Sequence, residues 1–308
     1  MPAYHIERSI RIDAPREKVL GLVNDFSEWP HWSPWLCMER SAKVDVYGTP
    51  GTNDHGYDWE GELVGAGGMK FNSVDGDTLN MDLHFLKPFK STAGVRFDVK
   101  AVGDQTDVTW HMDGKMPFFL FFMIDGIKTY VGLDYERGLK MLKEYAETGS
   151  VKSKLTIEGV VDTPEMHYIG VNAQCTMDEI GDSMKTTLPA ADELAKKSGI
   201  DITGPPAAIY HKTDLKNRDI EYSAVLPVKA ATPIDGASCG TIPAGKAIKV
   251  THVGSYHHLG NGWSAAMAEQ RYRKHKLAKA IPSYEVYTSD PSETEEADIV
   301  TEIYIPVR

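Results

Sequence analysis

The chain has 308 residues, of which 42% are hydrophobic and 25% charged, and its 44 acidic and 33 basic side chains give a formal net charge of -11. This composition is typical of a soluble globular protein with room for two domains. The acidic balance argues against nonspecific binding to nucleic acid or to anionic membranes. The three cysteines fit neither a disulfide framework nor a zinc motif, and no apolar signal core opens the chain, so we expect a cytoplasmic protein.

The first half of the chain predicts a strand, a helix, a tryptophan-rich turn, a run of strands and a long final helix. Alternating apolar residues over Tyr4–Ile12 indicate the strand, and Asp13–Pro15 is typical of a helix start. Short alternating runs separated by Gly, Asp and Asn clusters over Met38–Met112 predict a curved antiparallel sheet. An apolar residue recurs every three or four positions over Ile127–Thr148, which predicts a helix that Gly149 ends.

Two segments of this half are unusually apolar. The stretch Trp29–Trp35 holds three tryptophans and two prolines, so we expect it to fill the end of a core and not to form regular helix. The run Pro117–Ile124 is too short to span a bilayer, which needs about 20 residues. We interpret it as a buried or cavity-capping segment in preference to a membrane or partner contact.

Three segments give the first half a family resemblance: Ile10–Pro15, Val23–Trp35 and Gly132–Leu139. With the order of elements, they resemble the SRPBCC (START-like, polyketide-cyclase-like) superfamily over about residues 3–149. The resemblance implies an α+β helix-grip fold, in which a curved antiparallel sheet surrounds a long C-terminal helix with an apolar cavity between them. It implies little about activity, since members bind lipids or hormones, cyclise polyketides or assist chaperones.

The second half contains an internal duplication. After a polar linker at Gly149–Lys154, similar residues recur at one constant spacing, and each copy predicts a strand, a helix and two strands. We therefore predict a domain of residues 1–149 and one of 150–308, the latter with repeats of about 154–230 and 240–308 about a pseudo-twofold axis and a groove at their junction. The matched positions are Leu226–Val228 with Ile305–Val307, Pro164 with Pro243, Ile169 and Val171 with Ile248 and Val250, and Thr176 with Ser255.

The elements predicted in the two copies follow the same pattern. A capping box at Thr176–Glu179 begins the first helix. In the last strand, Ile299–Val307, alternation places Glu302 and Tyr304 on the face opposite the more apolar one. The other predicted elements are strands at His167–Gln174, Gly204–His211, Asp219–Val228, Lys246–Val253 and Ser283–Thr288, a first helix that ends at Gly199, and a second helix that follows Gly260–Gly262 and runs through Tyr272.

The second half resembles the GyrI-like effector-binding fold, which is also the ligand domain of AraC-type and MerR-type regulators. The segments that carry the likeness over about residues 154–308 are Gly204–Tyr210, Gly245–Tyr256, Gly262–Trp263 and Thr301–Val307. The resemblance implies a groove that binds cationic or neutral aromatic compounds, with a glutamate of the last strand at its base. Because no helix-turn-helix precedes the domain, we do not extend the regulator role to this chain.

Glu302 matches the position of that glutamate, and the aromatic walls that we expect around it are Tyr210, Tyr256, Trp263 and Tyr304. The first hypothesis is a protein that binds small apolar or cationic aromatic molecules in this groove, with the N-terminal cavity as a second apolar site. The second is a hydrolase or cyclase with Glu302 as acid or base. The third is a protein-docking module resembling chaperone cofactors. No catalytic residue, cofactor or protein partner is assigned, and we expect neither nucleic-acid binding nor membrane insertion.

Two further groups of polar residues have ordinary interpretations. His252, His257 and His258 lack a carboxylate or cysteine at a matching spacing, so we expect solvated or core roles for them and no metal site. Asp58, Glu60 and Glu62 alternate along one face of a predicted strand, and we interpret them as a solvated sheet face in preference to side chains that project into the N-terminal cavity.

Overall fold

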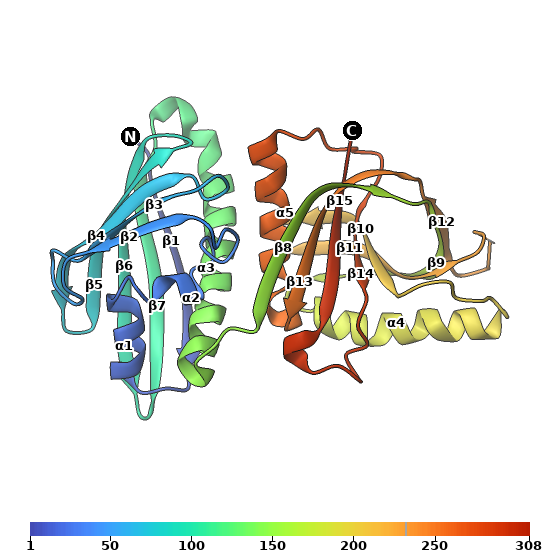
Figure 1. Cartoon of the computed structure of the whole chain (residues 1–308), viewed down its shortest axis with the longest axis horizontal. Coiled ribbons are helices and arrows are strands. Elements are labelled where there is room, and N and C mark those ends of the chain that lie inside the picture. The colour runs from blue at the N-terminus through green and yellow to red at the C-terminus, as the bar shows by residue number, and fades with distance from the viewer. Residues whose placement is uncertain (232) are drawn as a thin grey trace. The chain divides into compact units, whose positions relative to one another are not determined.

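The structure is a computed structural model that describes residues 1–231 and 233–308. The chain divides into two compact units, Met1–Val151 and Lys152–Arg308, and each contains one antiparallel sheet with helices (Figure 1). Both units therefore have the predicted α+β class. Within the described residues, every helix is too short or too polar to cross a bilayer.

The N-terminal unit has the predicted helix-grip fold. Its seven strands form one sheet in the order β1-β7-β6-β5-β4-β3-β2, which curves against the long helix α3 (Figure 1). The elements of this unit are β1 (Ala3–Ile12), α1 (Arg16–Asn24), α2 (Trp29–Trp32), β2 (Lys43–Tyr47), β3 (Gly56–Glu60), β4 (Ala66–Asp75), β5 (Thr78–Lys87), β6 (Ser91–Val102), β7 (Gln105–Lys115), the 3₁₀ helix η1 (Phe118–Met123) and α3 (Ile124–Thr148).

Aromatic rings fill the space between this sheet and α3. Trp110 of β7 stacks on Tyr135 of α3 with ring centroids 4.0 Å apart, and Phe97 of β6 stacks on Trp110 at 4.7 Å. Trp29 and Trp32 are fully buried against the same cluster, which confirms that the tryptophan-rich segment fills the core. The expectation of no helix in that segment was wrong, because Trp29–Trp32 forms one helical turn; its proline lies in the first turn, where a missing N–H costs nothing.

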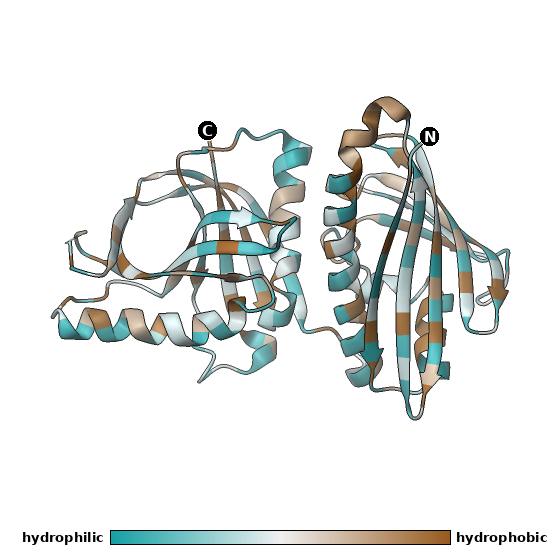
Figure 2. Ribbon diagram, turned by 180° about the vertical axis from the view of Figure 1, so that it is seen from behind, coloured by the Kyte–Doolittle hydropathy of each residue, from teal (hydrophilic) through white to brown (hydrophobic). Residues whose placement is uncertain are grey.

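The apolar run before α3 is exposed, so the interpretation of it as buried was wrong. Phe118, Phe119, Phe121 and Phe122 are 57–75% exposed, and Figure 2 shows this turn as a continuous hydrophobic segment. The run forms η1, whose three residues per turn direct successive side chains around the helix axis, so that one neighbouring element cannot cover them all. Helix α3 begins at Ile124, three residues before the predicted start, and ends as predicted at Gly149, whose φ is +81°.

The C-terminal unit is built on an eight-stranded sheet in the order β12-β9-β11-β10-β14-β15-β13-β8. Figure 1 shows its two helices, α4 and α5, running in different directions. The elements are β8 (Ser153–Thr163), β9 (Met166–Thr176), α4 (Ile180–Lys197), β10 (Ala207–Asp214), β11 (Asp219–Val228), β12 (Ser238–Ile242), β13 (Gly245–Gly254), the 3₁₀ helix η2 (Tyr256–His258), α5 (Gly260–Arg273), β14 (Ser283–Tyr287), the 3₁₀ helix η3 (Glu296–Asp298) and β15 (Val300–Val307).

The strand order shows the predicted pseudo-twofold symmetry. β10 and β14 form the centre of the sheet. Outward from β10 lie β11, β9 and β12, and outward from β14 lie the equivalent strands β15, β13 and β8. The first strand of each repeat pairs with the other repeat, since β8 pairs with β13 and β12 pairs with β9. Neither β8 nor β12 was predicted, and the linker prediction overlapped the start of β8. These exchanged strands join the two repeats into one hydrogen-bonded sheet.

The helices cover the outer strands and leave the centre of the sheet between them. Helix α4 packs on β9 and β11, whereas α5 packs on β13, β8 and β15. Only half of the predicted capping box forms before α4. A Glu179 oxygen accepts the backbone N–H of Thr176 at 3.0 Å and its hydroxyl at 2.8 Å, whereas, in the part of the chain that the structure describes, the Thr176 side chain caps no backbone N–H and the N-cap of α4 is Glu179. The helix-facing side chains of β10 and β14 therefore lie in the gap that the two helices frame.

Candidate functional site

A buried glutamate lies in this gap. Glu285 is the third residue of β14 and is 1% exposed. It pairs with Ala208 on β10 and with Ile303 on β15. Because side chains alternate along a strand, Glu285 and Tyr287 point to the same face of the sheet, and Tyr284 and Val286 point to the other. The Glu285 face is the face that packs against α4, where Tyr287 contributes to the hydrophobic cluster.

The Glu285 carboxylate accepts hydrogen bonds from three neutral aromatic side chains. The Tyr287 hydroxyl donates to Oε2 at 2.7 Å and the Tyr210 hydroxyl donates to the same oxygen at 2.9 Å. The indole N–H of Trp263, from α5, donates to Oε1. In residues 1–231 and 233–308, no basic side chain forms an ion pair with Glu285. The negative charge of the carboxylate is thus stabilised by two hydroxyl groups and one indole N–H, and not by a cation.

Burial dominates the electrostatics of this group. Removal from water raises the pKa of Glu285 above its ordinary value of 4.5, while the hydrogen bonds from Tyr287, Trp263 and Tyr210 act in the opposite direction. Burial, followed by the nearby Glu285 charge, raises the pKa of both Tyr210 and Tyr287 well above 10.0. The tyrosines therefore stay protonated as donors, and the site favours any ligand that brings a positive charge to the carboxylate.

Further aromatic and methionine side chains surround this carboxylate. The Trp263 ring meets Tyr210 edge-on at 5.3 Å, and the Tyr256 ring meets Tyr287 edge-on at 6.0 Å. Tyr256 is 39% exposed, so it links the buried carboxylate to the surface. Met184 of α4 lies 4.0 Å from the Tyr287 hydroxyl. We call this group the Glu285 site; its residues are Glu285, Tyr210, Tyr287, Trp263, Tyr256 and Met184.

The five residues predicted to bind a ligand do not all come together. Tyr210 and Trp263 contact Glu285 directly, and Tyr256 contacts Tyr287 beside it. Glu302 and Tyr304 lie on the opposite face of the sheet, because Glu302 pairs with Val286 while Ile303 pairs with Glu285. The cause is register, since neighbouring strands align Ile303, and not Glu302, with the helix-facing glutamate.

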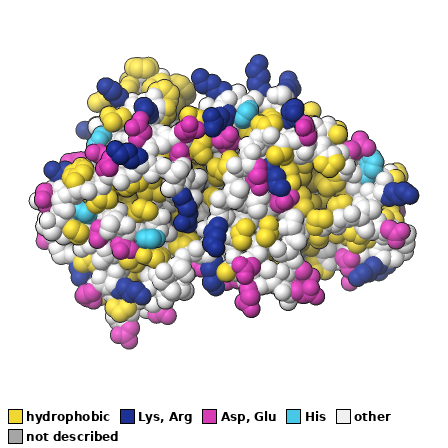
Figure 3. Space-filling model, viewed as in Figure 1, with side chains coloured by type: hydrophobic (Ala, Val, Ile, Leu, Met, Phe, Trp, Pro, Cys, Tyr) yellow, Lys and Arg dark blue, Asp and Glu magenta, His cyan; other side chains and the backbone are white. Residues whose placement is uncertain are grey.

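On that opposite face Glu302 has its own partners. Lys249 of β13 donates to its Oε1 at 2.6 Å, and the Tyr304 hydroxyl donates to Oε2 at 2.7 Å. Tyr304 also stacks on Tyr284 at 4.8 Å. The Glu302 charge is thus compensated by a lysine. Figure 3 shows hydrophobic side chains collected in a hollow on the C-terminal unit, with acidic and basic side chains at its edge.

The analysis of the sequence missed Glu285 and Tyr287, although it placed a strand at Ser283–Thr288. The available signal was the run Tyr284–Tyr287, in which Glu285 and Tyr287 are two residues apart and therefore share one face of the strand.

The three histidines take the expected core and solvated roles: His252 and His258 are buried and His257 is exposed. Burial lowers the pKa of His252 to about 4, and its Nε2 lies 3.1 Å from the Ser153 hydroxyl.

The fold and the Glu285 site define a mixed α+β protein with a domain suited to small molecules. Comparison with family models agrees: residues 3–147 match the model for polyketide cyclase/dehydrase and lipid transport, and residues 160–308 match the GyrI-like small-molecule-binding domain. The chain is therefore a fusion of an SRPBCC-like domain and a GyrI-like domain. Comparison with curated proteins found no match.

Solved structures resemble one half of the chain each. EcmrR in an EcmrR–DNA complex is 19% identical over 56% of this chain and 64% of its own, with a TM-score of 0.45, so the match spans less than two thirds of that protein. SAV2435 bound to tetraphenylphosphonium is 12% identical over 50% of this chain and 94% of its own, with a TM-score of 0.40. The Aha1 dimer from Colwellia psychrerythraea is 16% identical over 48% of this chain and 99% of its own, with a TM-score of 0.36.

Proposed function

We propose that the C-terminal unit binds a small organic cation that carries aromatic groups, and that it does so at the Glu285 site. The observation that carries the proposal is a buried carboxylate whose hydrogen-bond partners are all neutral: Tyr210, Tyr287 and Trp263. A buried charge without a counter-ion is costly, and a cationic ligand would supply that counter-ion. The same residues present aromatic rings, which attract cations through their π-faces.

The arrangement also supports selectivity for aromatic ligands. The edges and faces of Tyr256, Tyr287 and Trp263 offer rigid apolar area at little cost in side-chain entropy. The flexible thioether of Met184 can adapt to ligands of different shape. A flat or propeller-shaped aromatic cation would therefore gain both apolar burial and ion pairing, whereas an aliphatic ammonium would gain mainly the latter.

The proposal concerns the C-terminal unit because the N-terminal interior is occupied by its own side chains. Trp110 stacks on both Tyr135 and Phe97, and all three rings are buried between the sheet and α3. An apolar ligand at that position would have to displace these stacked rings. At the Glu285 site the groups that contact the carboxylate are polar, and the 39% exposed Tyr256 lies beside them.

A comparison of a cationic with a neutral ligand tests the proposal. We expect isothermal titration of the intact chain to detect binding of tetraphenylphosphonium, and to detect binding of neutral triphenylphosphine oxide that is weaker by about tenfold or more, because only the cation neutralises Glu285. Equal affinity for the two compounds, or no binding of the cation, would contradict the proposal. Thermal shifts provide a second readout, since a ligand of the folded state raises its melting temperature.

The pH dependence of cation binding provides a further prediction. Below the raised pKa of Glu285 the carboxyl group is neutral, so we expect the affinity for tetraphenylphosphonium to fall as the pH is lowered through that pKa, which lies above 4.5. Tetraphenylphosphonium has a permanent charge, so any change of affinity with pH reports on protonation of the protein. The raised pKa stabilises the folded state below 4.5, and this contribution is lost as pH rises through the folded-state pKa. Glu285 therefore does not unfold the protein at low pH, and an affinity that rises on acidification would contradict the assignment.

A further inference from the structure

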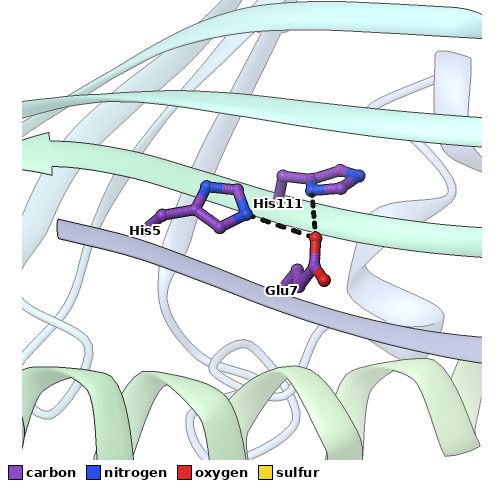
Figure 4. A group of neighbouring side chains, drawn as sticks. All are labelled: His5, Glu7 and His111. Atoms are coloured by element: carbon purple, nitrogen blue, oxygen red, sulfur yellow. Dashed lines mark hydrogen bonds and ion pairs between the residues drawn. The ribbon is translucent and has the colours of Figure 1, made fainter.

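We propose that His5 and Glu7 of β1 and His111 of β7 form a binding site for Zn²⁺ on the sheet of the N-terminal unit. Figure 4 shows the three side chains converging, with a nitrogen of each histidine directed at the same Glu7 oxygen. One ligand atom from each residue lies within 4.8 Å of the other two. Two imidazoles and a carboxylate are a common donor set for this ion.

Strand pairing brings these residues to one face of the sheet. Glu7 pairs with His111, and His5 pairs with Asp113, in the antiparallel ladder of β1 and β7. Because side chains of paired residues project to the same side and alternate along each strand, all four point away from the face that carries the buried Ile6 and Met112. The site is thus held on the edge strand β1 and the hydrogen-bonded strand β7 beside it, and it does not depend on a loop.

The spacing of the donor atoms fits a tetrahedral ion. His5 Nε2 and His111 Nδ1 each lie 3.3 Å from Glu7 Oε2. Ligands at about 2.0–2.1 Å from zinc stand about 3.4 Å apart along the edges of a tetrahedron. The two histidine nitrogens lie within 4.8 Å of each other, so a bound ion would draw them closer together.

His111 supplies the observation that is independent of this clustering. Its side chain is 6% exposed, and its Nδ1 is a buried atom that has no hydrogen-bond partner among the residues that the structure describes, although it lies 3.3 Å from Glu7 Oε2. Buried polar atoms are nearly always hydrogen-bonded, so an unpartnered nitrogen aimed at a carboxylate indicates a missing ligand. A metal ion bound to the Nδ1 lone pair would satisfy it.

The second nitrogen of each histidine contacts a carboxylate, as is usual for metal-bound histidines. His5 Nδ1 lies 2.8 Å from Asp113 Oδ1, and His111 Nε2 lies 3.1 Å from Asp98 Oδ2. A proton on His5 Nδ1 would leave His5 Nε2 free to bind metal, and a proton on His111 Nε2 would leave His111 Nδ1 free. Arg96 Nη2 also lies 3.2 Å from His111 Nε2 and 3.5 Å from Asp98; because a guanidinium only donates, metal binding at Nδ1 would require His111 Nε2 to keep its proton for Asp98 and Arg96 to hydrogen-bond to Asp98 instead.

Three protein ligands leave the fourth position of a tetrahedral ion open. The side chains of His5 and Glu7 are 46% and 61% exposed, so this position faces water, as in zinc sites that bind an exchangeable fourth ligand. The chemical class of ligand is a divalent first-row cation with a water or an anionic oxygen as its fourth donor.

Zinc titration of the intact chain tests the site. After removal of metal with a chelator, we expect the wild type to bind one Zn²⁺ tightly, and His5→Ala and Glu7→Gln each to weaken this binding by about tenfold or more, with Asp113→Asn weakening it about 10- to 100-fold by loss of orientation. His5 and Glu7 are exposed, so these variants are expected to fold, which circular dichroism checks. Visible absorption of the Co²⁺-loaded protein gives a second readout of tetrahedral coordination.

His84→Ala is the matched control, because His84 belongs to the same unit and lies 3.9 Å from Asp58 at a half-exposed position without a second histidine. We expect it to bind Zn²⁺ like the wild type. A wild type that binds no zinc, or His5→Ala and Glu7→Gln variants with wild-type affinity, would overturn the proposal. Either result would leave the three residues as an ordinary network of ion pairs.

Discussion

Glu285→Gln is expected to weaken the binding of tetraphenylphosphonium by about 10- to 150-fold. Charged hydrogen bonds and ion pairs in sites shielded from water contribute about 1.5–3 kcal/mol, and each 1.4 kcal/mol is about a factor of ten in affinity. Glu285 is 1% exposed and has no basic partner in the described part of the chain, so the ligand would provide its only positive charge. Isothermal titration of the intact variant measures the loss.

The substitution should leave the fold in place. Glutamine has the shape of glutamate, and its oxygen can still accept the indole N–H of Trp263. The hydroxyls of Tyr210 and Tyr287 can rotate to accept hydrogen bonds from the new NH₂ group. The unfolding transition of the variant should therefore stay close to that of the wild type, so a change in affinity reports on charge.

Glu302→Gln is the matched control for this experiment. Glu302 is also a glutamate beside a tyrosine on a neighbouring strand, but Lys249 already neutralises it and it lies on the other face of the sheet. We expect the affinity of the Glu302→Gln variant for tetraphenylphosphonium to stay within about twofold of that of the wild type. The opposite pattern, with Glu302→Gln abolishing binding and Glu285→Gln neutral, would move the site to the Glu302 face and contradict the assignment made here.

Trp110→Ala is expected to cost the N-terminal unit about 3–5 kcal/mol of its free energy of unfolding. Large aromatic side chains in a core lose this much when they are truncated, because the transfer energy is lost and a cavity remains. Trp110 is fully buried, stacks on Tyr135 and Phe97, and meets Trp29 edge-on at 5.9 Å. A change of this size corresponds to a drop of roughly 6–20 °C in the melting temperature of that unit.

Differential scanning calorimetry measures this drop, and hydrogen exchange in β6 and β7 locates it. Trp110→Phe should cost much less, since it keeps a stacked ring and since the Trp110 indole N–H has no hydrogen-bond partner in residues 1–231 and 233–308. Phe119→Ala, at a 73% exposed aromatic residue of η1, should change stability by less than about 0.5 kcal/mol. Equal effects of Trp110→Ala and Phe119→Ala would contradict the packing described for the core.

Much of the architecture of both units could be predicted from the order of apolar and polar residues. Local periodicity located α3 and α4, and the constant spacing of the duplication predicted the symmetry of the eight-stranded sheet. The strands β8 and β12 were missed, although β8 alternates between exposed and half-buried residues along its length; what its local pattern does not show is that it pairs with the other repeat. The exposure of η1 was also missed, because hydrophobicity alone does not tell whether another element covers a segment.

The amino-acid sequence by itself indicated most helices and strands through periodicities within single elements, and the duplication through one constant spacing. The class of ligand-binding domain followed from the resemblance to the GyrI-like fold. Only the tertiary structure decided which glutamate lies among Tyr210, Tyr287 and Trp263. Alternation along β15 shows that Glu302 and Tyr304 share a face, but the register between β14 and β15 determines which face points to the helices. The same holds for His5, Glu7 and His111, which are distant in the chain and meet only because β1 pairs with β7.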